Sequence, residues 1–405
     1  MKPAPAPIHI VRGEGALLFD VDGKTYIDAI SSWWTNIHGH AHPWLAQKLF
    51  EQFQQLEHVI FAGFTHTPAQ KLADRLIHFL PNSIEKIFFS DNGSTSVEVA
   101  LKMAIQYWNN KGGNRKKIIA FEHAYHGDTF GSMSVSDRGA FTKSFHDYLF
   151  DVLFIPPPFK GNENNCLQQF ENAIAQNDIA AFIYEPLVMG AGGMLMYEPE
   201  HLELLLQKAK SKNIICIADE VMTGFYRTGK LFASEYCEMK PDIICLSKGL
   251  TGGTMAMGIT ACAQFIFDAF YDDDKMKAFY HGHSYTANPL ACAVANASLD
   301  LIELSTFNEQ INRIVNTHQE FALKIKDHPK IQNCRQTGTI IAFDIASTNE
   351  TNYFNSLRDR MYDYFISKGI LLRPLGNTIY IMPPYCMKEE ELNKVYKSIL
   401  EFIED

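Results

Sequence analysis

Residues 90–96, SDNGSTS, combine a glycine with several hydroxyl-bearing side chains just before a candidate amphipathic helix. Gly93 would let the backbone approach an anion, and the free amides at the start of a helix favour negative charge there. Ser94 would add a hydroxyl donor. Because the same residue types cap helices, an ordinary N-cap is an equally good interpretation of this segment by itself.

Asp219 and Glu220 place two carboxylates at the end of a buried strand candidate at 214–219. Burying a carboxylate is costly unless a cation meets it. A protonated pyridine nitrogen is such a cation, and the carboxylate in turn favours its protonated form. The alternatives are a metal site or a solvated pair of loop acids. A metal ion would need further ligands, and this segment supplies no histidine, so we expect no metal.

Lys248 follows the strand candidate 243–247, 29 residues after Asp219. A lysine whose amine is removed from water has a lowered pKa and can form an imine with a carbonyl group. Gly252 and Gly253 would leave room beside it for a large planar group. Most lysines are simply solvated. A catalytic role for Lys248 is favoured by the order of features along the chain: a loop that could bind an anion, an aspartate at a strand end and then a lysine at a strand end.

The elements that must hold these residues alternate between strand and helix. After the strand candidate Ile84–Ser90, a helix presents apolar residues at helical spacing, and short apolar strands follow. This alternation predicts an α/β fold with a mainly parallel sheet covered by helices on both faces. In such a sheet, ligands bind at the carboxyl edge. The helix face is formed by Val97, Leu101, Ala104, Ile105 and Trp108, and the later strand candidates are Lys117–Phe121, 180–184, 214–219 and 243–247.

The two ends of the chain have a mixed character and predict a second, smaller domain. Residues 10–30 indicate short strands with a turn at Asp22-Gly23. A chain of 405 residues is long enough for two domains. We expect a large domain at 50–295 and a smaller α+β domain formed by 1–49 and 296–405.

The composition narrows the class of protein and its surroundings. The net charge of -10 argues against nucleic acid or an anionic membrane as the main partner. The eight cysteines form no C-x-x-C pair and several lie in apolar runs, which is typical of buried thiols in a reducing compartment. The start lacks a signal-peptide stretch, and no uncharged apolar run has membrane-spanning length. We therefore expect a cytoplasmic protein.

Residues 219–229, DEVMTGFYRTG, resemble the D-E-[VI]-x-T-G-F-G-R-T-G run of the class III aminotransferases, with Tyr226 where glycine is usual. The resemblance extends from about residue 10 to the C-terminus. It implies the fold-type I architecture, whose large domain has a seven-stranded sheet, and pyridoxal 5′-phosphate as cofactor. It also implies a Schiff base at Lys248, Asp219 at the pyridine nitrogen and Tyr125 stacked on the ring. The further cofactor contacts that it implies are Gly93, Ser94, His126 and Val221.

Within this class the chain is most similar to the branch that serves biotin synthesis, which transfers an amino group from S-adenosylmethionine to 8-amino-7-oxononanoate. Paired tryptophans can be core residues, but the similarity implies that Trp33 and Trp34 form an aromatic wall for a long alkyl chain and that Tyr125 contacts substrate. It also implies that Arg373 holds the acceptor's carboxylate by a bidentate contact and that Gly282 contacts substrate. Without the resemblance, Arg373 would be taken as a surface arginine. The segments that carry it are 31–39, 125–131, 190–194, 373–376 and 382–385.

Residues 281–289, HGHSYTANP, correspond to an H-G-P-T-F-M-G-N-P run in this class. Ser284 keeps the hydroxyl that in the family reaches the phosphate of the neighbouring subunit's cofactor. The resemblance therefore implies a homodimer with active sites at the subunit interface. His283 replaces a proline, so we expect a less rigid loop.

Two other functions fit many of the same residues. One is a class III aminotransferase that uses another omega-amine or lysine as donor; the paired Trp33 and Trp34 favour the biotin branch instead. The other is a pyridoxal-phosphate aminomutase or a non-catalytic cofactor-binding protein. Lys248 and Asp219 disfavour the non-catalytic alternative, and an arginine-held acceptor disfavours the aminomutase.

The biotin-branch enzymes usually have a Trp-His-Pro-Tyr-Thr segment before the first strand. Here the strand candidate 8–11 follows Met1 almost at once, without that segment. We expect that the natural chain starts further upstream, because the other aromatic residues of the site are retained.

Overall fold

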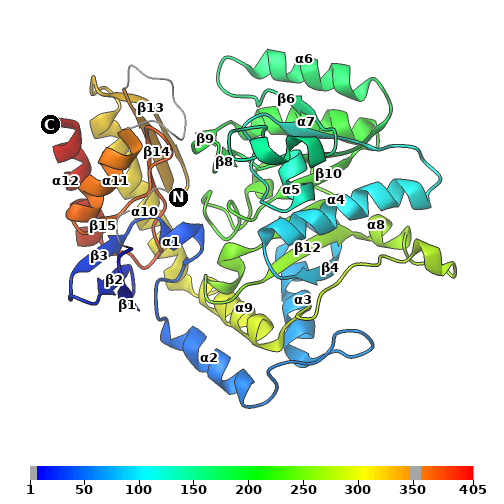
Figure 1. Ribbon diagram of the computed structural model, residues 1–405, viewed down its shortest axis with the longest axis horizontal. Helices are drawn as coiled ribbons and strands as arrows, with labels where there is room; N and C mark the ends of the chain where they lie inside the picture. The colour runs from blue at the N-terminus through cyan, green and yellow to red at the C-terminus, as the bar shows by residue number, and fades with distance from the viewer. Residues whose placement is uncertain (1–6, 347–356, 405) are drawn as a thin grey trace. The chain divides into compact units, whose positions relative to one another are not determined.

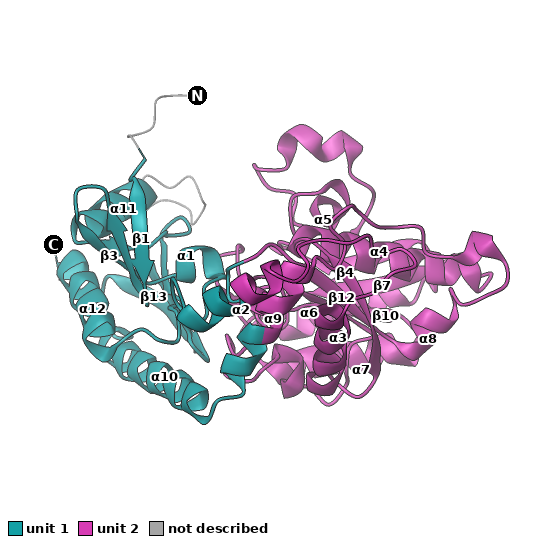
Figure 2. Cartoon of the chain, turned by 90° about the horizontal axis from the view of Figure 1, so that it is seen from below, with its two compact units in different colours: residues 1–48, 252–254, 297–405 teal, residues 49–251, 255–296 magenta. Residues whose placement is uncertain are grey.

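The computed structural model describes residues 7–346 and 357–404. The expectation of an upstream start concerns the chain around Met1 and lies outside the described residues. Two compact units divide the chain, one comprising 49–251 and 255–296 and the other comprising 1–48, 252–254 and 297–405 (Figure 2).

A seven-stranded sheet forms the centre of the larger unit, in the order β4-β12-β11-β10-β7-β5-β6. Figure 1 labels β4, β12, β10 and β6 of this sheet. The pairs among β11, β10, β7, β5 and β6 are parallel, whereas β12 is antiparallel to both of its neighbours. The predicted mainly parallel sheet is therefore confirmed. Its strands are β4 (Ile84–Ser90), β12 (Gly258–Ala263), β11 (Ile243–Leu246), β10 (Ile215–Asp219), β7 (Ile179–Tyr184), β5 (Lys117–Phe121) and β6 (Leu153–Ile155).

Helices cover both faces of this sheet because successive strand residues point to opposite sides. In β7, Ala181 and Ile183 pack in one core with the buried residues of α4 (Gly93–Asn110). Phe182 lies between them in sequence and contacts Phe170 of α6, with 5.0 Å between ring centroids. The other α-helices that lie wholly in this part are α3 (Thr67–Phe79), α5 (Phe130–Val135), α6 (Glu163–Ile174), α7 (Pro199–Ser211) and α8 (Gln264–Asp268).

The predicted apolar face of α4 is correct except at one position. Val97, Leu101 and Ala104 are buried and Trp108 packs against the same core, but Ile105 is exposed. Ile105 is adjacent in sequence to Ala104 and therefore lies about 100° further around the helix. Ile105 therefore lies at the border of the apolar face of α4 and is turned toward solvent.

Gly190 to Gly193 make the tight turn between β8 (Val188–Met189) and β9 (Leu195–Met196), which pair as a two-stranded hairpin.

The smaller unit contains two sheets, ordered β1-β2-β3-β15 and β13-β14-β16. The turn at Asp22-Gly23 joins two antiparallel strands, as predicted. The first strand was predicted at 8–11, whereas it begins at Ile10 and ends at Glu14. The strands are β1 (Ile10–Glu14), β2 (Leu17–Asp20), β3 (Thr25–Asp28), β13 (Ile331–Thr337), β14 (Ile340–Ile345), β15 (Ile370–Leu371) and β16 (Thr378–Ile381). The helices are α1 (Ser31–Trp34), α10 (Ser305–Ile325), α11 (Leu357–Ser367) and α12 (Glu389–Glu404), while α2 spans Pro43–Phe53 and α9 spans Pro289–Ile302.

Gly252 and Gly253 belong to the smaller unit, and the expectation that they leave room for a planar group is not supported. A Cβ on Gly252 would lie 2.8 Å from a ring carbon of His38, and one on Gly253 would lie 2.5 Å from the Asn36 side chain. Both glycines thus allow close packing against protein side chains.

Among the described residues, no single helix is both long and apolar enough to cross a membrane; α9 and α10, bent by 73°, pass that test only when taken together.

Candidate active site

Asp219 ends β10 at the carboxyl edge of the large sheet, where it is only 5% exposed. One carboxylate oxygen lies 2.7 Å from Nδ1 of His126, and the other accepts the backbone N–H of Val221 at 3.1 Å. The backbone N–H of His126 donates in turn to Ser136 Oγ at 2.8 Å. The fold therefore supplies a histidine that the strand segment itself lacks. Across the described residues, no three His, Cys, Asp or Glu side chains form a group that could hold a metal ion.

Glu220 is adjacent to Asp219 in sequence but has a structural role. Its buried carboxylate accepts hydrogen bonds from the hydroxyls of Thr223 and Ser234 and from the amides of Ala233 and Ser234. Burial raises the pKa of this carboxyl, and these hydrogen bonds oppose the shift. Of the two predicted strand-end acids, only Asp219 contacts His126.

Lys248 follows β11, the strand that pairs with β10. Burial lowers the pKa of its amine to about 8, although the negative charges of Asp219 and Glu185 oppose this shift. Roughly a tenth of such amines are neutral near pH 7, compared with roughly one in a few thousand for an ordinary lysine. The neutral amine is the form that attacks a carbonyl carbon.

The loop that carries Tyr125 lies against the start of α4. Tyr125 donates its hydroxyl to Asp128 at 2.9 Å and keeps 38% of its surface exposed. The backbone N–H of Asp128 donates to Ser94 Oγ at 3.1 Å. A Cβ on Gly127 would lie 2.1 Å from that same oxygen, so only glycine allows this approach. The predicted residues Ser94 and Tyr125 are thereby brought to one edge of the sheet.

The N-cap interpretation of residues 90–96 is confirmed, and the anion-binding interpretation stays a prediction. Asn92 is the N-cap of α4 and accepts the backbone N–H of Thr95 at 2.9 Å. No acceptor among the described residues pairs with the backbone N–H of Gly93 or Ser94, which leaves two donors for an anion. Gly93 also packs against Val221, since a Cβ on it would lie 2.8 Å from that side chain.

Glu185 is a further residue of this edge that we did not predict. It follows β7 directly, is buried, and accepts the backbone N–H groups of Tyr125 and Gly190 at 3.0 and 2.9 Å. Burial raises the pKa of Glu185 to about 7; the positive charge of His126 opposes the shift and the negative charge of Asp219 adds to it. The strand-end rule that selected Asp219 would also have selected Glu185.

Gly282 and Ser284 lie on an exposed part of the segment 281–285. An exposed hydroxyl is compatible with the predicted contact to the cofactor of a neighbouring subunit.

Trp33, Trp34 and Arg373 belong to the smaller unit. Trp34 is 4% exposed and donates its indole N–H to the hydroxyl of Tyr380 at 3.0 Å. Trp33 is 55% exposed, and the guanidinium carbon of Arg373 lies 4.3 Å from the centre of one of its rings. Of the two predicted wall residues, Trp33 is the one with an available ring surface.

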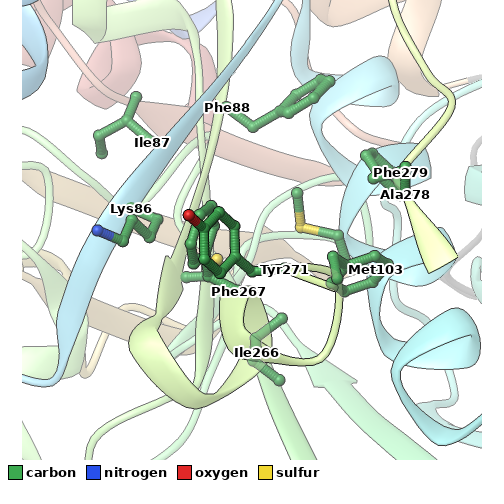
Figure 3. Close-up of a pocket in the computed structure, with 11 residues that line it drawn as sticks. Lys86, Ile87, Phe88, Met103, Ile266, Phe267, Tyr271, Ala278 and Phe279 are labelled. Atoms are coloured by element: carbon green, nitrogen blue, oxygen red, sulfur yellow. The ribbon is translucent and has the colours of Figure 1, made fainter. Parts of the chain in front are cut away.

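A separate apolar cavity of about 320 Å³ lies beside β4 and β12 (Figure 3). Lys86, Phe88, Met103, Phe267 and Phe279 are among its lining residues, and none of the predicted site residues lines it. The cavity is therefore not the site predicted from the sequence.

The sequence profile described as aminotransferase class-III matches residues 2–403, and the chain belongs to this family. The chain is similar to the adenosylmethionine-8-amino-7-oxononanoate aminotransferase of Synechococcus elongatus, with 46% identity covering 100% of this chain and 97% of that one. The Helicobacter pylori protein of the same name is 36% identical over 98% of this chain and 92% of its own.

Solved structures agree with this assignment and confirm the fold-type I architecture. The Methanocaldococcus jannaschii protein of the same name superposes with a TM-score of 0.94 at 32% identity, covering 98% of this chain and 93% of that one. A Pseudomonas amine transaminase in its pyridoxal-phosphate-bound form gives 0.93 at 29% identity, covering 99% and 96%.

Class III aminotransferases depend on pyridoxal phosphate, and the residues present fit this cofactor. Lys248 offers an amine of lowered pKa for its aldehyde carbon, and Asp219 offers a buried carboxylate for its ring nitrogen. Tyr125 offers an aromatic face, while Gly93 and Ser94 offer two N–H groups at a helix start for its phosphate.

Tyr226 stands at the position where the family usually has glycine. Its φ of 71° is the left-handed conformation that glycine adopts most easily. Its backbone N–H still donates to the Leu231 carbonyl at 3.2 Å, so the turn is kept in spite of the side chain.

Proposed function

We propose that this chain transfers an amino group from S-adenosylmethionine to 8-amino-7-oxononanoate, yielding 7,8-diaminononanoate in biotin synthesis by a ping-pong exchange. The names of the full-length relatives support this proposal. The observation that carries it is the half-buried guanidinium of Arg373, which lies over Trp33. No acid among the described residues forms an ion pair with Arg373, so its donors suit the carboxylate of a long acceptor.

The roles of the residues follow from their positions. Lys248 would bind the cofactor through its amine and, once released by the donor, would carry the proton between the substrate carbon and C4′. Asp219, oriented by His126, would hold the proton on the ring nitrogen. Tyr125 would contact the ring face, and Gly93 and Ser94 would bind the phosphate. When bound, the cofactor supplies an electron sink.

We also propose a cytoplasmic homodimer with a large domain at 50–295 and a small domain formed by 1–49 and 296–405. The compact units of the chain support this division.

Replacing Arg373 with alanine should weaken the acceptor half-reaction by about 2–5 kcal/mol, the range for truncating one partner of a buried charge pair. The donor half-reaction should change little. Stopped-flow measurement of the two half-reactions separates them. Equal losses in both would place Arg373 outside the acceptor site.

Ser284 should act on the cofactor of the other subunit. If so, mixing the Ser284→Ala and Lys248→Ala variants produces heterodimers in which one of the two sites keeps both native residues. Activity recovered on mixing supports the shared site. A lack of recovery, with heterodimers shown by native mass spectrometry, contradicts it.

Other members of the class provide the main rival, because amine transaminases also superpose closely on this chain. A donor panel of S-adenosylmethionine, lysine and a simple amine, with diaminononanoate formation measured for each, decides between them. Product formed with S-adenosylmethionine supports the proposal. If diaminononanoate is formed only with another donor, the proposed acceptor is correct and the proposed donor is wrong. If amines are turned over without any formation of diaminononanoate, the proposal is refuted.

A further inference from the structure

We infer that Trp33 is a positioning residue, whose indole holds the guanidinium of Arg373 in the plane needed to bind a carboxylate. This inference rests on the proposed function, in which Arg373 binds the acceptor's carboxylate. It gives Trp33 a role different from the aromatic wall expected for a long alkyl chain.

The contact between the two side chains carries the first step. The guanidinium carbon of Arg373 lies over a ring of Trp33 at 4.3 Å from the ring centre, within the range of a cation–π interaction. A guanidinium that stacks on an aromatic face uses its flat surface for the contact. Its five N–H donors point outward in the plane and stay available for a bidentate partner.

The backbone on which Trp33 sits is held in an unusual conformation. Ser31, Ser32 and Trp34 have φ values of 52°, 60° and 69°, in the left-handed region that non-glycine residues seldom adopt. Such conformations persist only when the surrounding structure fixes them, and they are frequent at ligand-binding sites. Trp33 is therefore presented by a constrained segment.

Asp28 provides much of this constraint. Its fully buried carboxylate accepts the backbone N–H and the hydroxyl of Ser32 at 2.8 and 2.9 Å and lies 2.8 Å from His40 Nε2. Ser31 donates its hydroxyl to the Met382 carbonyl at 2.9 Å, and the indole N–H of Trp34 donates to the hydroxyl of Tyr380. Both neighbours of Trp33 are thus fixed while its own ring remains exposed.

The test compares two unreactive ligands, octanoate and octanamide, which share an alkyl chain and differ in charge. Their dissociation constants for the holoenzyme are measured by calorimetry. A positioning role predicts that Trp33→Leu weakens octanoate roughly 3- to 30-fold, the range of cation–π energies, and leaves octanamide nearly unchanged. Trp33→Phe should keep part of the effect. In an Arg373→Gln background, Trp33→Leu should cause no further loss.

Trp44→Leu is the matched control, because Trp44 also lies under a cation in the same unit, with Lys48 Nζ 4.5 Å from its ring. It should leave the octanoate preference unchanged. If Trp33→Leu weakens the binding of octanoate and octanamide equally, Trp33 is part of an apolar wall and the inference is wrong. The inference is also wrong if the losses of octanoate affinity in Trp33→Leu and Arg373→Gln add up in the double variant. A native enzyme that does not prefer octanoate would also overturn it. If the preference holds and depends on Trp33 while no diaminononanoate is formed, the positioning role stands and the proposed substrate is wrong.

Discussion

Replacing Lys248 with alanine should abolish covalent attachment of pyridoxal phosphate and lower turnover by at least ~10²- to 10⁴-fold, the range lost with a general acid–base group. The variant removes the amine that follows β11, the strand that pairs with β10 and its last residue Asp219. Borohydride reduction of the native holoenzyme followed by peptide mapping should place the label on Lys248. Label on a different lysine would refute the assignment.

The same residue gives a pH-dependent prediction. Burial lowers the pKa of Lys248 to about 8, so the neutral amine accumulates as the pH rises through that value. Covalent uptake of pyridoxal phosphate by the apoprotein should therefore accelerate from pH 6.5 to 8 and level off above about 8.5. Lys248→Arg is the matched control, because it keeps the positive charge but offers no amine that can form the bond. Uptake that keeps rising toward pH 10 would indicate an ordinary lysine.

Asp219→Asn should retain the cofactor but react roughly 30- to 5,000-fold more slowly, which corresponds to about 2–5 kcal/mol for a lost charge partner. The amide has the shape of the carboxylate and can still accept the Val221 N–H, so the fold should be preserved. A neutral amide cannot hold the proton on the pyridine nitrogen.

Single-turnover kinetics with the donor alone, together with the cofactor content from absorbance, separates the chemical effect from loss of binding. Glu220→Gln is the matched control at the next position, because its carboxylate fixes a loop through four hydrogen bonds. It should lower the thermal stability more than the single-turnover rate. A transamination rate near that of the native enzyme in Asp219→Asn would exclude the electron-sink role.

The sequence by itself determined five of the seven strands of the central sheet, all but β6 and β12, and it selected Asp219 and Lys248 as the candidates for binding the cofactor. Buried parallel strands need continuous apolar runs, which are visible along the chain, and each such run ends where the sheet edge begins. Asp219 and Lys248 were identified because each is polar directly after such a run. The strand pairing of the smaller unit was harder to predict from the sequence, because its four-stranded sheet pairs segments from both ends of the chain.

Which contacts the predicted residues make was decided only by the tertiary structure. Hydrogen bonds between distant segments, such as His126 with Asp219 or Tyr125 with Glu185, leave no periodic pattern in the sequence. The two paired tryptophans differ for the same reason. Trp33 and Trp34 are adjacent and chemically identical, but the backbone constrained at Ser32 buries one ring against Tyr380 and exposes the other to Arg373. Residue type and spacing indicate which groups can do chemistry, whereas burial and contact across the chain decide which of them face a ligand.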